Sequence, residues 1–166
     1  MTLKKLEPEE LERRIERLHK QYVDEKLHCS ERTFLVVHSV LETDFSPETV
    51  ALLSGLAGGI GGTHSSVCGA VTGGIAALGL VYGRRKPHEE LAEGSKEKGI
   101  EVSRDFFCQF KSRFGSVVCG ELIGDLLRKN EADSEERRER CFQYTLNAIK
   151  LCIETLSKYE KIYAEG

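Results

Sequence analysis

The sequence has no tryptophan and only three prolines among its 166 residues, and aromatic residues make up 7% of it. Because proline disrupts helices and interior strands, its scarcity leaves long uninterrupted segments, which favours helices over many short strands. The scarcity of aromatic residues predicts a mostly aliphatic core, and a hydrophobic content of 40% is enough to form one. We therefore expect a single all-α domain over residues 1–166.

An excess of basic residues is also missing. The 24 Lys and Arg residues are outnumbered by 27 Asp and Glu residues, which gives a formal net charge of −3. Proteins that bind DNA or RNA usually carry a basic excess. We therefore predict that nucleic acid is not a partner of this protein.

Charged residues are absent from residues 49–83, and ten of the sixteen glycines lie there. A membrane-spanning helix needs about 20 predominantly apolar residues, but polar residues at 63–66 interrupt this stretch. We therefore predict no membrane span, and instead two short buried helices over 48–58 and 68–82 joined by a Gly-rich loop. The charged N-terminal residues do not form a signal peptide, so we expect a cytoplasmic location in which cysteines stay reduced.

Helical periodicity predicts a compact bundle of five or six helices. Residues 1–28 are expected to form a charged N-terminal helix that begins at Pro8. Residues 29–83 are expected to hold a helix over 30–43 and then the Gly-rich hairpin, with its buried Gly/Ala-rich helix. Residues 84–166 supply the C-terminal helices after a charged connector.

An aromatic stripe marks the first of these C-terminal helices. Its members recur at every fourth position, which is typical of a core face, and are Val102, Phe106, Phe110 and Phe114. Further helices are predicted over 117–128 and 134–163, separated by a polar stretch that we expect to be a solvated loop.

The six cysteines are irregularly spaced and do not resemble a disulfide scaffold. Four of them lie at or near the starts of predicted helices: Cys29, Cys68, Cys119 and Cys141. A helix N-terminus has unpaired N–H groups and a positive partial charge, and both stabilise the thiolate that acts as nucleophile or metal ligand. The other two, Cys108 and Cys152, lie within predicted helices beside core residues, and we expect them to be buried and inert.

The surroundings of these four cysteines resemble a known family. Cys68 begins a Cys-Gly-Ala-Val-Thr-Gly string that follows the Gly-rich stretch and precedes a Leu-Gly-Leu segment. His28-Cys29, the segment from Phe110 to Leu122 and Arg140-Cys141 supply the other three positions in the same order. Together they resemble the redox-active proteins named for a C…GCAxxG…C…C pattern. One departure is the loop at 62–64, where the family often has a longer side chain.

The resemblance implies a small helical redox protein with a redox partner protein. The four cysteines carry over as metal and cofactor ligands, with Gly69 beside Cys68 because glycine permits close backbone approach. Four thiolates complete an iron–sulfur cluster or, alternatively, a zinc site. Their separations of 39, 51 and 22 positions include no Cys-x-x-Cys pair, so the tertiary fold must bring them together. Covalent haem attachment is excluded because the sequence has no Cys-x-x-Cys-His motif.

Two other interpretations remain open. In a thiol–disulfide or thiol-sensing protein, Cys68 would be the catalytic, attacking thiolate and Cys29 or Cys119 would resolve the disulfide. His64 or His28 would then serve as a base or as an alternative ligand, although a loop histidine is more often simply solvated. In a non-catalytic module, the Gly/Ala-rich helices would pack in a homo-oligomer. The sequence lacks P-loop, dinucleotide-binding, serine-hydrolase and zinc-protease motifs, and so it names no substrate and does not decide whether the protein is an enzyme.

Overall fold

The computed structural model describes residues 1–84, 95–129 and 134–164. Helices account for nearly all of the regular structure in these residues, which confirms the predicted all-α class. In chain order the elements are β1 (Thr2–Leu3), α1 (Pro8–Asp24), α2 (Cys29–Ser39), β2 (Leu41–Glu42), the 3-10 helix η1 (Pro47–Leu56), α3 (Gly69–Tyr82), α4 (Ser95–Phe114), α5 (Cys119–Leu122), α6 (Gly124–Arg128) and α7 (Glu135–Ala164).

The helices begin where local chemistry favours them. Pro8 occupies the first turn of α1, where its missing N–H costs nothing, and two glutamates follow it at the positive end of the helix dipole. Ser46 caps η1, because its hydroxyl accepts a hydrogen bond of 3.2 Å from the backbone N–H of Glu48.

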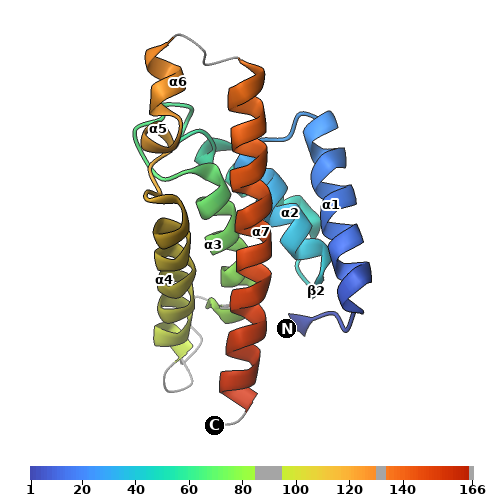
Figure 1. Cartoon of the computed structure of the whole chain (residues 1–166). Coiled ribbons are helices and arrows are strands. Elements are labelled where there is room, and N and C mark those ends of the chain that lie inside the picture. Colours follow the sequence, from blue (N-terminus) through green and yellow to red (C-terminus); the bar gives the residue numbers. More distant parts are fainter. Residues whose placement is uncertain (85–94, 130–133, 165–166) are drawn as a thin grey trace.

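The long helices form a bundle around α3. Helix α7 runs the length of the molecule, with α4 on one side and α1 on the other (Figure 1). Helix α3 packs against α2, α4 and α7. Two glycines allow this close packing: a Cβ at Gly73 would overlap the carbonyl of Ser30 in α2, and one at Gly74 would clash with the ring of Phe106 in α4. The Gly/Ala-rich helix is therefore buried, as predicted.

The core confirms the predicted aromatic stripe. Val102, Phe106 and Phe110 of α4 are fully buried, and Phe114 packs against the edge of the core. Most of the other core side chains are aliphatic, as the composition predicts.

Three predicted helices differ from the observed ones. Helix α2 ends at Ser39, because the next residues form β2, which pairs antiparallel with β1. The segment predicted as a buried helix over 48–58 is the 3-10 helix η1, in which only Leu53 is buried. The helix predicted over 117–128 begins at Cys119 and is interrupted at Ile123, where ψ is 13°.

Some predictions concern residues that are only partly described. The charged connector over 84–99 and the polar loop after residue 129 lie largely outside the described residues. Within the described ranges, no helix is both long and apolar enough to cross a membrane.

Candidate functional site

A short backbone pairing brings Cys68 and Cys119 together. Val67 and Val118 form an antiparallel bridge. The N–H of Cys68 donates to the carbonyl of Val117 at 2.8 Å, and the N–H of Cys119 donates to the carbonyl of Ser66 at 2.9 Å. This pairing ties the Gly-rich loop to the chain that enters α5, and the two lie side by side in Figure 1. Two cysteines that are 51 positions apart thus stand at adjacent helix starts.

Helix α2 brings the third cysteine to the same place. Cys29 is the first residue of α2, and its sulfur lies so close to Gly69 that a Cβ at position 69 would overlap it. Gly69 was predicted to allow close approach to a cofactor. The described contact is with the sulfur of Cys29, so the glycine is needed for the cysteines themselves to approach one another.

The four cysteines, which we call the motif cysteines (Cys29, Cys68, Cys119 and Cys141), line one cavity of about 180 Å³. Cys141 reaches it from α7, two turns inside the helix and not at its start. We call this cavity the cysteine pocket; its other lining residues are Leu27, His28, Arg32, Ala57, Gly58, His64, Leu122, Ile123, Arg137, Tyr144 and Thr145.

The remaining two cysteines lie outside the pocket. Cys152 is fully buried and its thiol contacts the carbonyl of Gly74 at 3.6 Å, which confirms the prediction of a core residue. The prediction for Cys108 is wrong, because this residue is exposed. It is two positions from both Phe106 and Phe110, and at 3.6 residues per turn that places it on the opposite face of α4.

The motif cysteines share a cavity but do not converge on a single point. Among the described residues, no group of three or more His, Cys, Asp or Glu could hold a metal ion as it stands. All six cysteines are free thiols.

Burial controls the ionisation of these thiols. It raises the pKa of Cys68, and the neighbouring sulfur of Cys29 raises it further. Burial and the same neighbour raise the pKa of Cys119 to about 11. The pKa of Cys141 is also raised by burial, with Arg137 opposing the shift. The stabilisation of thiolates expected at helix starts is therefore outweighed by burial, and these three groups are protonated at neutral pH in the metal-free protein.

His64 takes part in the pocket, although loop histidines are usually solvated. Its backbone has a φ of +58°, a left-handed conformation that is uncommon for residues other than glycine. Two hydrogen bonds hold it there: its N–H donates to Gly58 at 2.8 Å, and its carbonyl accepts from Gly120 at 2.6 Å. As a result its Nδ1 lies 3.4 Å from the sulfur of Cys119.

Two arginines in the pocket were missed by sequence reasoning. Arg32 follows Cys29 by one turn of α2, and Arg137 precedes Cys141 by one turn of α7. Residues three or four positions apart share a helix face, so this spacing was a usable signal. Tyr144, one turn beyond Cys141, also lines the pocket, and its hydroxyl donates to the carbonyl of Leu122 at 3.1 Å.

Comparison with known proteins identifies the family. Residues 27–155 match the family described as "Putative redox-active protein (C_GCAxxG_C_C)". The chain belongs to this family. The matched residues include all four motif cysteines, and α1 lies before the first matched residue. Neither a curated protein nor a solved structure matches the chain.

Proposed function

We propose that this member of the family is an electron-transfer or redox-sensing protein that holds an iron–sulfur cluster in the cysteine pocket. The observation that carries the proposal is that four cysteines from four separate elements line a single cavity of about 180 Å³. Cysteine thiolates are the usual ligands of [2Fe–2S] and [4Fe–4S] clusters, and four of them complete the set.

The lack of a single-ion arrangement among the described residues favours a cluster over one metal ion. A tetrahedral zinc ion requires four sulfurs at about 2.3 Å from one point. The described arrangement contains no such group. In a cluster the thiolates bind different iron atoms, so the sulfurs stand farther apart, and a shared cavity suits this requirement better than a single-ion site does.

Burial argues against the thiol–disulfide alternative. An attacking thiol must reach its target and be deprotonated, but Cys68 is only 7% exposed and burial raises its pKa. A bound cation reverses this effect, because a metal displaces the proton of the thiol that coordinates it. The pocket is thus better suited to binding a metal group than to attack by a free thiolate.

The residues of the pocket have distinct tasks in this proposal. The motif cysteines supply the thiolates, and Gly69 leaves the space that the sulfur of Cys29 occupies. The pairing of segment 66–68 with segment 117–119 fixes the separation of Cys68 and Cys119. A bound cluster supplies one-electron chemistry, which the side chains of the protein lack. The electron is exchanged with a redox partner protein.

The test is metal analysis of protein isolated without oxygen. We expect the wild-type protein to contain iron and acid-labile sulfide, and each Cys→Ser variant of the motif cysteines to lose most of both. Cys108→Ser is the matched control: it removes an exposed cysteine outside the pocket and should retain the cluster.

Two results would contradict the proposal. Zinc without iron would indicate a structural zinc site. Metal-free protein in which Cys68 is alkylated rapidly near neutral pH would indicate thiol chemistry.

A further inference from the structure

Among the described residues, the cysteine pocket is lined by two cations and by no carboxylate. The cations are Arg32 and Arg137, and in the described part of the chain the buried Nε of each has no hydrogen-bond partner. A buried N–H group without a hydrogen-bond partner costs free energy, so this arrangement requires an explanation.

A nearby arginine on α7 is paired with carboxylates. Arg140 forms ion pairs of 2.6 Å with Glu136 on the same helix and with Asp125 of α6, and the second pair links α7 to α6. Within the described residues, neither Arg32 nor Arg137 forms an ion pair of this kind. Each lines the pocket one turn of helix from a motif cysteine, Arg32 from Cys29 and Arg137 from Cys141.

We infer that Arg32 and Arg137 are the counter-charges of the thiolate-bound group and that they raise its reduction potential. This inference rests on the proposed function. Thiolates that coordinate a cluster carry negative charge into the pocket, and the two guanidinium groups are already in place to balance it. The two arginines act through the thiolates and not on a substrate, so they are positioning residues.

The redox consequence follows from charge. A bound cluster would supply a one-electron couple, and its reduced form would carry one more negative charge than its oxidised form. A cation fixed nearby stabilises this reduced form more than the oxidised form, and the effect is strong where water is excluded. Net charge and hydrogen bonds to the sulfurs are recognised determinants of cluster potential.

The test compares Arg32→Gln and Arg137→Gln with a matched control, Arg138→Gln. Arg138 lies beside Arg137 on α7, is exposed and does not line the pocket. Its replacement removes one positive charge from the protein, as the other two substitutions do, but not from the pocket. The midpoint potential of the anaerobically isolated proteins is measured by titration with dithionite as reductant and ferricyanide as oxidant. We expect each pocket variant to have a more negative potential. The reduced-to-oxidised ratio at a fixed potential should fall about tenfold, which is about 59 mV for one electron.

A second measurement separates this role from a merely structural one. Thermal unfolding of the metal-free proteins should give Arg32→Gln and Arg137→Gln a Tm equal to or above that of the wild type, because each removes a buried Nε–H group that has no partner among the described residues. Arg32→Lys keeps the positive charge but not the planar set of guanidinium N–H donors. Its midpoint potential should therefore be much closer to that of the wild type than the potential of Arg32→Gln is.

The outcomes separate a failure of the proposed function from a failure of the role given to the two arginines. If the wild-type protein holds no cluster, the proposed function fails. If it holds a cluster and the pocket variants keep the potential of the wild type, or shift no more than Arg138→Gln does, then only the inference about the arginines is overturned. A lower Tm for the metal-free pocket variants would also overturn it, because the arginines would then stabilise the fold itself.

Discussion

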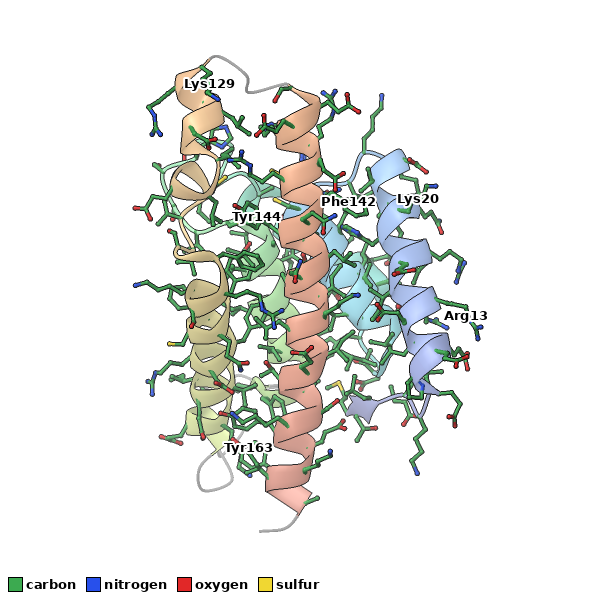
Figure 2. The ribbon with its side chains drawn as sticks, viewed as in Figure 1. Arg13, Lys20, Lys129, Phe142, Tyr144 and Tyr163 are labelled. Carbon is green, nitrogen blue, oxygen red and sulfur yellow. The ribbon has the colours of Figure 1, made fainter. Side chains whose placement is uncertain are left out.

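His19 should make the stability of the metal-free protein depend on pH. It lies on α1, is fully buried, and stacks on Phe142 of α7 with ring centroids 4.3 Å apart. Phe142 lies on the side of α7 that faces α1, whereas Tyr144 lies on the opposite side (Figure 2). Neither ring nitrogen of His19 has a hydrogen-bond partner among the residues that the structure describes. Burial, with a smaller contribution from Arg32, lowers its pKa from 6.5 to about 4.

The sign and size of the effect follow from proton linkage. Below pH 6.5 the unfolded chain takes up a proton at His19, whereas the folded protein does so only near pH 4. The folded state therefore loses stability as the pH falls from 6.5 to 4, and the contribution of His19 is constant outside that window. At about 1.4 kcal/mol per pH unit, the full loss is about 3 kcal/mol.

Urea unfolding between pH 4 and pH 7.5 measures this contribution. His19→Phe keeps an aromatic ring against Phe142 but cannot titrate, so the free energy of unfolding of the wild type should fall relative to that of the variant as the pH is lowered. His28→Phe, at an exposed position, is the control and should follow the wild type. A constant difference between wild type and His19→Phe across this range would refute the reasoning.

Three further predictions concern packing, backbone strain and thiol accessibility. Gly69→Ala should destabilise the protein by about 1–3 kcal/mol, because the new Cβ overlaps the sulfur of Cys29. Gly79→Ala is the control: its Cβ meets nothing within 4 Å, and it should stabilise α3 by about 0.5–1 kcal/mol. Chemical denaturation measures both free energies of unfolding, and equal effects of the two substitutions would contradict the packing described. Ile60→Gly should raise the Tm, since a β-branched residue at φ +65° is strained and glycine is not; a lower Tm would count against strain at this position. In the metal-free protein, iodoacetamide should modify the exposed Cys108 well before the buried Cys68, and mass spectrometry of peptides taken during the reaction would detect the reverse order.

Local patterns were sufficient to predict the bundle. The charge-free stretch and the small residues of α3 predicted a buried helix, and the four-residue spacing from Val102 to Phe110 predicted the core face of α4. These features depend on residues that are close in sequence. The 3-10 form of η1 was not predictable in the same way, because its apolar residues suggest burial that the fold gives only to Leu53.

The pocket depends on long-range contacts that periodicity does not encode. The order of the cysteines suggested that they act together, but the bridge between Val67 and Val118 decides which two are adjacent. The apolar pair at 117–118 suggests the start of a helix, but in the structure Val118 has an extended backbone and forms that bridge. The charged sequence neighbours of His19 give no indication that it is buried, whereas helix packing places its ring in the core.

The most direct measurement is an anomalous diffraction map, recorded at the iron absorption edge, from crystals of protein isolated and grown without oxygen. The account predicts anomalous density inside the cysteine pocket, within bonding distance of the sulfurs of Cys29, Cys68, Cys119 and Cys141. Two results would contradict the claim that these four thiols form one redox centre. One is anomalous density elsewhere in the molecule, and the other is an empty pocket in crystals whose protein contains iron by metal analysis.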